Sequence, residues 1–228
     1  MTTVHLISTD IDERYYGRWA ERPAYAGTDP SYRIHCLVRE TFGPRRILRP
    51  FRVVNGRGRC LLGYSPMTAD EIRERARAKS AGTTRRKALS VETLRSIELP
   101  SFQTGDRLSF SVLAVPHRRS NGVREIDAFR LARRDGCASR QDAYVDWLRD
   151  RAERSGIVAV ETARLVSYDV TPQIRRRRHS HLPITRADIT GTLRIRRPDR
   201  LGEFMLAGIG RHRAYGYGMM MIRGLLRP

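Results

Sequence analysis

The apolar residues of this 228-residue chain run twice through the same order of elements. Alternating apolar residues indicate strands, and apolar residues three or four positions apart indicate helices. On this basis the first half predicts strand, helix, two hairpin strands, helix and strand at 4–7, 29–43, 51–54, 59–64, 68–79 and 91–99. That is the order of elements in one ferredoxin-like, or RRM-like, unit.

The second half of the chain repeats this order. Its strand, helix, two strands, helix and strand are predicted at 106–115, 141–155, 157–170, 184–195, 199–207 and 218–222. We therefore predict an α+β protein with two tandem ferredoxin-like β-α-β-β-α-β domains, covering residues 1–100 and 101–228.

Three segments between these elements are predicted to be loops. Residues 10–27 are rich in Tyr and Arg, and this segment is long for a connection in a compact domain, which favours a functional or mobile loop. Residues 80–87 are small and basic and are typical of a surface loop. Residues 117–124 form a basic excursion that follows the strand at 106–115.

A glycine-rich stretch leads into the last predicted strand. Glycine accepts positive φ and lets other groups approach its backbone, so the amides of such a loop can surround an anion. Basic side chains lie among the glycines, and we expect the anion to be a nucleic-acid phosphate. The candidate RNA-binding residues here are Gly208, Gly210, Arg211, His212, Arg213, Gly216 and Gly218. The glycines alone are equally consistent with a helix C-cap before a strand that tolerates glycine.

Two tyrosines, Tyr215 and Tyr217, alternate with the glycines of this stretch. We expect at least one of them to lie in the core. Stacking on a nucleic-acid base is the alternative role for these rings.

The charge of the chain also points to nucleic acid. The net charge is +20, and all of the 44 basic residues except Lys79 and Lys87 are arginines. The planar guanidinium group suits phosphates and guanine edges better than the point charge of lysine does. A GC-rich genome would explain the shortage of lysine, but it would not explain the excess of basic over acidic residues.

Several classes of protein are disfavoured by the sequence. Cys36, Cys60 and Cys137 are too scattered for a disulfide framework or a Cys/His metal site, so we expect no metal, no cofactor and a reducing cytoplasm. The chain has no run of 18 apolar residues and no secretory leader pattern at its start, so we expect no membrane association.

The helix predicted at 29–43 carries candidate catalytic residues. Tyr32, His35 and Arg39 share one stripe of this helix, because His35 and Arg39 follow Tyr32 by three and seven positions. Intramolecular RNA cleavage needs a base for the 2′-hydroxyl proton, stabilisation of the transition-state charge and an acid for the leaving oxygen, and these residue types can supply all three. The alternatives are a structural histidine and, for Arg39, a solvated helix face.

Basic runs form further candidate RNA-binding sites. Arg175, Arg176, Arg177 and Arg178 lie between two predicted strands, where a hairpin tip can present them to an RNA duplex near the end of its stem. Arg118, Arg119 and Arg124 form a second basic cluster, for which the case is weaker. The alternative for each run is a solvated loop.

Taken together, these motifs resemble the CRISPR repeat-RNA endoribonucleases, namely the CasE family of type I-E (Cascade) systems, which are proteins of RAMP type. The resemblance rests on the Tyr-x-x-His at 32–35 and on the Gly-hydrophobic-Gly-x-x-basic-x-aromatic-Gly-x-Gly at 208–218. It extends to residues 50–53, 105–116 and 147–156 and to the whole of 189–222.

This resemblance implies metal-independent cleavage of precursor CRISPR RNA beside a repeat stem-loop. It implies that the enzyme then keeps the mature RNA as a subunit among other Cascade-type effector proteins, and that it is a monomer outside that complex. His35 matches the catalytic histidine of the family, Tyr32 its companion, and Arg213 the basic position of the glycine-rich loop. Cleavage of this kind would leave a 2′,3′-cyclic phosphate and a 5′-hydroxyl.

Other possibilities remain open at the level of the sequence. The insertion at 10–27 and the second histidine, His212, leave open which histidine does the main chemistry. A crRNA-processing relative from a type IV system, a stem-loop binder that does not cut, and a sequence-indifferent DNA or ribosomal-RNA protein are the alternative functions.

Overall fold

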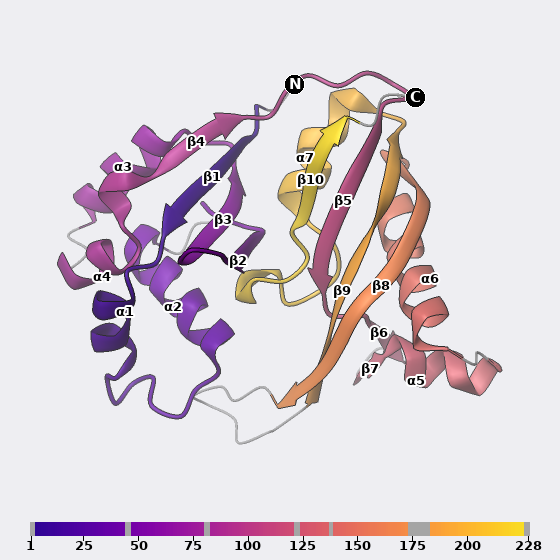
Figure 1. Cartoon of the computed structure of the whole chain (residues 1–228), viewed down its shortest axis with the longest axis horizontal. Coiled ribbons are helices and arrows are strands. Elements are labelled where there is room, and N and C mark those ends of the chain that lie inside the picture. The colour runs from indigo at the N-terminus through magenta and orange to yellow at the C-terminus, as the bar shows by residue number, and fades with distance from the viewer. Residues whose placement is uncertain are drawn as a thin grey trace.

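The computed structural model describes residues 3–43, 47–79, 83–120, 124–136, 139–172 and 183–225. These residues form two four-stranded antiparallel sheets and a separate two-stranded hairpin (Figure 1). No helix in the described ranges is long and apolar enough to cross a membrane.

The first sheet has ferredoxin-like topology, as predicted. Its strands pair in the order β2-β3-β1-β4, and every pair is antiparallel. The strands are β1 (His5–Asp10), β2 (Phe51–Asn55), β3 (Arg59–Ser65) and β4 (Arg95–Glu98). The two helices of the β-α-β-β-α-β order are α2 (Pro30–Phe42) and α3 (Ala69–Ala78), and the 3-10 turn η1 (Val91–Thr93) precedes β4.

Helices α2 and α3 begin where the sequence places their caps. The side chain of Asp29 accepts hydrogen bonds from the amides of Ser31 and Tyr32, and Pro30 occupies the first turn of α2. Helix α2 then ends at Gly43. At the start of α3, Thr68 and Glu71 form a reciprocal capping box.

Two of the predicted loops contain helices. Residues 10–27 include α1 (Glu13–Ala20), whose first turn is capped by Asp12 and which buries Trp19 completely. The indole of Trp19 stacks on Tyr25, with ring centroids 4.3 Å apart. The described part of 80–87 belongs to α4 (Thr83–Ala88). Both predictions were wrong because these segments hold helices in place through their aromatic and basic side chains: Trp19 of α1 and Arg85 of α4 donate hydrogen bonds to Glu40 of α2.

The second sheet repeats the same topology in the order β10-β5-β9-β8. Its strands are β5 (Arg107–Ala114), β8 (Val158–Pro172), β9 (Pro183–Ile195) and β10 (Met220–Leu225). Its helices are α6 (Arg140–Glu153) and α7 (Leu201–Ala207), with the 3-10 turns η3 (Pro198–Arg200) before α7 and η4 (Arg213–Tyr215) before β10. The fold class of two tandem ferredoxin-like units is therefore confirmed, whereas the division of the chain at residue 100 stays a prediction.

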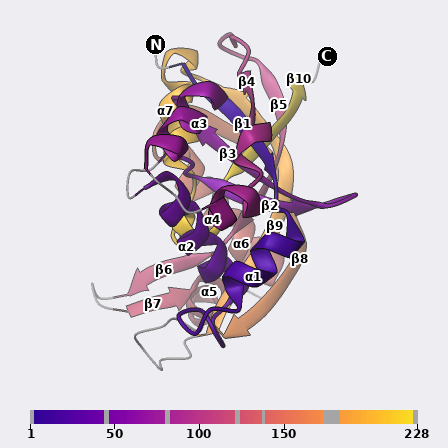
Figure 2. The same cartoon turned by 90° about the vertical axis from the view of Figure 1, so that its left-hand side faces the viewer.

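The basic excursion at 117–124 belongs to a short hairpin. Strand β6 (His117–Ser120) pairs with β7 (Arg124–Asp127), and α5 (Ala128–Ala132) and the 3-10 turn η2 (Arg133–Asp135) follow. These strands were not predicted because they carry few apolar residues and pair through their backbones. Figure 2 shows the hairpin at the end of the molecule opposite the two termini.

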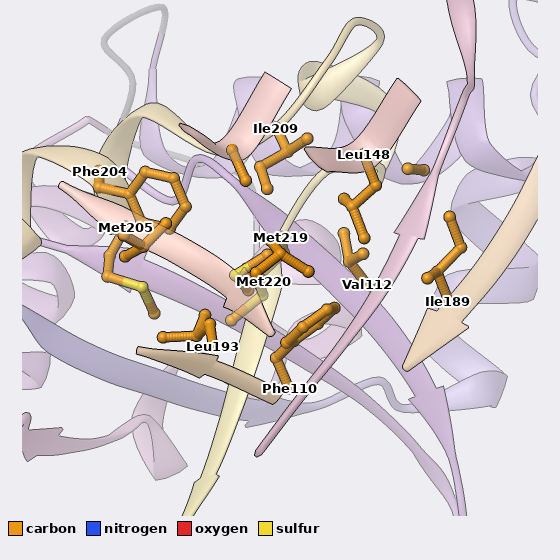
Figure 3. Packing of buried hydrophobic residues seen from close by; sticks show 14 of the residues in the cluster. Phe110, Val112, Leu148, Ile189, Leu193, Phe204, Met205, Ile209, Met219 and Met220 are labelled. Carbon is orange, nitrogen blue, oxygen red and sulfur yellow. The ribbon is translucent and has the colours of Figure 1, made fainter. Parts of the chain in front are cut away.

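The larger apolar core joins the two halves of the chain. Side chains from β5, β9, β10, α6 and α7 gather in it (Figure 3). Tyr64 and Val4 of the first half belong to the same cluster, and the Tyr64 hydroxyl donates a 3.0 Å hydrogen bond to the Met220 carbonyl. A second core lies between the first sheet and α1 to α4. The two sheets therefore hold a fixed position relative to each other.

Candidate active site

Two of the three residues predicted for catalysis on α2, Tyr32 and His35, face the glycine-rich loop that precedes β10. The ring centroids of His35 and Tyr215 are 4.8 Å apart, and those of Tyr32 and Tyr215 are 6.3 Å apart. The ring of His212 lies 6.0 Å from the same tyrosine. We call Tyr32, His35, His212 and Tyr215 the ring cluster. All four are partly buried.

The ring cluster joins elements that are far apart in the sequence. Tyr32 and His35 come from the first half of the chain, and His212 and Tyr215 come from the last twenty residues or so of the second half. In Figure 1, α2 is the helix of the first half that lies nearest to the loop before β10. The structure thus brings together both histidines between which the sequence left the choice open.

The path of the loop depends on its glycines. Gly208, Gly210, Gly216 and Gly218 all have positive φ, and so does His212 at 58°. At Gly218 a β-carbon would overlap the carbonyl oxygen of Ile209, and at Gly210 it would lie 2.9 Å from the ring of Trp147. The glycines are therefore required by packing inside the chain. Binding of RNA by the loop amides stays a prediction.

Hydrogen bonds hold the two ends of the loop. The amide of Ile209 donates to the Gly218 carbonyl at 2.8 Å, and the amide of Gly218 donates to the Leu113 carbonyl at 2.8 Å. The hydroxyls of Tyr217 and Ser31 lie 3.2 Å apart, which ties the loop to the first turn of α2. Tyr217 is only 4% exposed, so the prediction that at least one loop tyrosine lies in the core is confirmed.

A carboxylate on the β6–β7 hairpin holds the basic side of the loop. Glu125 forms ion pairs with Arg211 and with His212, whose Nε2 lies 3.2 Å from the Glu125 Oε2. A carboxylate in this position orients the imidazole of His212.

His117 lies next to this carboxylate in a buried position. Its Nδ1 is 4.0 Å from Glu125 Oε2, and neither ring nitrogen has a hydrogen-bond partner among the described residues. Burial is the main cause that lowers the pKa of His117, and the positive charges of His212 and Arg211 lower it further against the opposing effect of Asp127.

The remaining predicted RNA-binding arginines are distributed around the second half. Arg213 donates to the Ala207 carbonyl at the end of α7. Arg118 pairs with Asp150 of α6 at 3.4 Å and remains 38% exposed. Arg119 lies on β6 opposite Glu125. The run Arg175–Arg178 lies outside the described residues. Binding of RNA by these arginines stays a prediction.

Arg39 is separated from the ring cluster. It lies one turn further along α2, in a cavity of about 460 Å³ that is also lined by Cys36, Glu40, Lys79 and Arg85. Its predicted catalytic role stays a prediction, and its surroundings are considered again below.

Two residues of the site were not identified from the sequence as catalytic or positioning residues. Tyr215 was considered only for the core or for base stacking, although its place three residues after His212 was a usable signal. Glu125 gave no signal, because its role depends on a hairpin that the pattern did not predict. Among the described residues, no group of three or more His, Cys, Asp and Glu side chains is placed to hold a metal ion.

Solved structures with a similar fold are CRISPR proteins. CRISPR endoribonuclease Cse3 bound to a 19-nucleotide RNA aligns over 97% of this chain and 100% of its own, with a TM-score of 0.69 and 14% identity. The Thermus thermophilus Cse3 bound to an RNA representing a pre-cleavage complex aligns over 97% of this chain and 100% of its own, with a TM-score of 0.64 and 16% identity. A chain of a CRISPR RNA-guided surveillance complex aligns over 97% of this chain and 100% of its own, with a TM-score of 0.56 and 18% identity.

Comparison with curated protein sequences gave no match. The family model described as "CRISPR associated protein" matches residues 14–224, which include α2, the strands from β2 to β9 and the whole glycine-rich loop. Because this match spans nearly the entire chain, the protein belongs to the CRISPR-associated protein family.

Proposed function

We propose that this protein is an endoribonuclease that binds the stem-loop of a CRISPR repeat and cleaves precursor CRISPR RNA at the base of the stem. The observation that carries the proposal is the ring cluster, in which the imidazoles of His35 and His212 and the phenol of Tyr32 all lie next to the ring of Tyr215. Membership of the CRISPR-associated family and a fold like that of the RNA-bound Cse3 endoribonuclease support it.

The chemistry starts with an imidazole as the base. His35 takes the proton of the 2′-hydroxyl next to the scissile phosphate, and the 2′-oxygen forms a new bond to phosphorus. The bond from phosphorus to the 5′-oxygen breaks, and this oxygen receives a proton from a second imidazole, a role that we assign to His212, whose ring lies 6.0 Å from that of Tyr215. The products are a 2′,3′-cyclic phosphate and a 5′-hydroxyl.

The other cluster residues position the reacting groups. Tyr32 and Tyr215 pack beside the imidazole of His35, with ring centroids 6.4 Å and 4.8 Å from it, and present hydroxyls that can donate to phosphate oxygens. Glu125 keeps the imidazole of His212 oriented through its contact with Nε2. Arg211 and Arg213 add positive charge beside the path of the RNA backbone.

Retention of the product belongs to the same proposal. Cleavage at the stem base leaves the stem intact, so groups that bind the stem hold it equally well before and after the cut. The protein then remains on the mature crRNA as one subunit among other Cascade-type effector proteins. A similar fold within a CRISPR RNA-guided surveillance complex supports this assignment.

An end-mapping experiment tests the proposed function. The RNA copied from the palindromic repeat of the same genome is incubated with the protein in EDTA. The expected result is one cut at the stem base that leaves a 2′,3′-cyclic phosphate and a 5′-hydroxyl, because the nucleophile and the base are supplied without a metal ion. The same RNA with a 2′-deoxy nucleotide before the cut is the control and stays whole. A magnesium-dependent cut that leaves a 5′-phosphate contradicts the mechanism.

A further inference from the structure

A basic cavity lies on α2 beyond the ring cluster. It is lined by Cys36, Arg39 and Glu40 of α2, by Lys79 at the end of α3 and by Arg85 of α4. Its volume is about 460 Å³, and three of its five lining side chains are cations. We call it the α2 cavity.

The single carboxylate of the α2 cavity already has partners. Glu40 Oε2 accepts a 3.2 Å hydrogen bond from the indole of Trp19 and pairs with Arg85 at 3.2 Å and with Arg22 at 3.8 Å. Its other oxygen accepts from the Tyr25 hydroxyl. The carboxylate of Glu40 therefore holds the guanidinium of Arg85 in place. The negative charge of Glu40 is balanced by Arg85 and Arg22.

The other two cations of the cavity are not balanced in this way. Within the described ranges, neither Arg39 nor Lys79 forms an ion pair, and the Lys79 ammonium only approaches the Arg39 carbonyl at 3.5 Å. Like charges collected in one hollow repel each other, so an anion that enters the hollow gains the attraction of both and relieves that repulsion.

The position of the cavity indicates which anion this is. Arg39 follows His35 by four residues, so it lies on the same side of α2 and about 6 Å further along the helix axis. An RNA strand whose scissile phosphate sits at His35 and that continues along α2 brings its next phosphates to Arg39 and then to Lys79. An acidic protein segment would match the charge, but nothing would align it with the ring cluster.

We propose that the α2 cavity binds the phosphate backbone of the single-stranded RNA flank that is severed from the stem. This inference rests on the proposed function and assigns Arg39 to binding of the flank. It also gives a physical reason for selective release. After the cut, the stem stays bound by all the groups that held it before, whereas the severed flank is held only by the few cations of this cavity.

The two lysines of the chain offer a direct test. Lys79 lines the cavity, whereas Lys87 lies outside it on α4 and donates to the Tyr15 hydroxyl at 3.3 Å. Amine modification of each lysine is followed by mass spectrometry in two complexes. One contains repeat RNA with its flank and a 2′-deoxy nucleotide before the cut, and the other contains the same stem-loop trimmed at the cut.

The flanked RNA is expected to slow modification of Lys79 by about tenfold relative to the trimmed RNA, which corresponds to occupancy of roughly nine-tenths. Lys87 is expected to react equally in both complexes. Equal reaction of Lys79 in both complexes, in a protein that still cleaves the all-ribose RNA, overturns the inference and leaves the proposed function standing. Protection of Lys79 by other subunits of the complex but not by the flank also overturns it, because the cavity is then a protein-docking site.

Substitutions give a second, independent readout. Lys79→Ala and Arg39→Ala are expected to weaken binding of flanked RNA and to reduce its salt dependence by roughly 0.7 in log-log slope for each phosphate that is no longer bound, while binding of trimmed RNA is unchanged. Lys87→Ala is the matched control and leaves both affinities unchanged. Equal weakening for flanked and trimmed RNA contradicts a flank site. Failure of the wild-type protein to bind either RNA refutes the proposed function and this inference with it.

Discussion

Tyr215 is the side chain on which the site residues of the two halves meet. It packs against His35 and Tyr32 from α2, and His212 approaches it from its own loop. Interactions between such rings contribute about 0.5–1.5 kcal/mol each beyond their buried area. The imidazole of His35 is thus positioned by residues that lie about 180 positions away in the chain.

Removal of the His35 imidazole is predicted to impair chemistry and to leave binding intact. His35→Ala should lower the single-turnover cleavage rate on the order of 10²-fold or more, because a general base is typically worth that much. Affinity for the stem-loop, measured by fluorescence anisotropy, should stay nearly the same. His5→Ala on β1 is a matched histidine control and should cleave normally. A wild-type rate in His35→Ala would transfer the role of the base to His212.

His117 gives a pH-dependent prediction. Burial lowers its folded-state pKa below the ordinary value of 6.5, so the unfolded chain binds the proton more readily. The buried neutral imidazole of His117 therefore contributes stability that is fully present above the unfolded-state pKa. This contribution is lost as the pH falls toward the folded-state pKa. In urea unfolding below about pH 6.5, one such group contributes a slope of up to about 1.4 kcal/mol per pH unit. A His117→Phe variant should lack this part of the slope, and an identical slope in the variant contradicts the assignment.

Part of the candidate site could be read from the sequence, and part could not. The Tyr32 and His35 pair follows from the spacing on a helix whose Asp29 cap is recognisable. The approach of Tyr215 to His35 depends on a loop that turns through positive φ at five residues, and no local pattern gives its direction. Glu125 acts through tertiary interactions with Arg211 and His212, so the sequence carries no sign of it.

At the scale of elements, the glycine-rich loop packs against both halves of the chain and holds them together. Gly216 packs on Phe51 of β2, where a β-carbon would lie 3.2 Å from its ring, and Gly210 packs on Trp147 of α6. The Arg52 to Asp188 ion pair, at 3.0 Å, adds a second link between β2 and β9. The loop therefore fixes the ring cluster and the junction of the two sheets together.

This packing of the loop predicts that two glycine substitutions change the stability of the protein by unequal amounts. Gly218→Ala should destabilise the protein by about 1–3 kcal/mol or more, since a β-carbon there meets the Ile209 carbonyl and φ is +76°. Cleavage should fall as well, because the loop carries His212 and Tyr215. Gly56→Ala in the β2–β3 turn meets nothing within 4 Å and should change stability by less than about 1 kcal/mol. Equal unfolding midpoints for the two variants contradict this role of the loop.

Elements with strong local signals were predicted from the sequence, and those without were not. The helical spacing of apolar residues in α2 and α3 and the alternation in β5, β8 and β9 placed these elements correctly. Helix α1 was missed because its buried face consists of Tyr16, Trp19 and Ala20, which read as an irregular aromatic segment. Strands β6 and β7 were missed because polar and charged residues dominate them and backbone pairing alone defines them.

At the scale of the whole molecule, the proposed function assigns different roles to the two ferredoxin-like halves. In this proposal the first half supplies His35 and the α2 cavity, which act on the strand to be cut. The second half supplies the glycine-rich loop, the β6–β7 hairpin and much of the positive charge, which are proposed to bind the stem that remains. This division predicts that cutting and release are uncoupled, since the stem is bound in the same way before and after cleavage.

The stoichiometry of cleavage tests this account most directly. With a dissociation constant in the nanomolar range and an association rate of roughly 10⁵–10⁷ M⁻¹s⁻¹, the stem product leaves in about minutes to hours. Repeat RNA in tenfold excess over the protein should therefore be cut rapidly to one equivalent and then stop, with the stem-loop co-eluting with the protein. Rapid cleavage that continues past one equivalent, or no cleavage of the repeat RNA at all, would contradict the account.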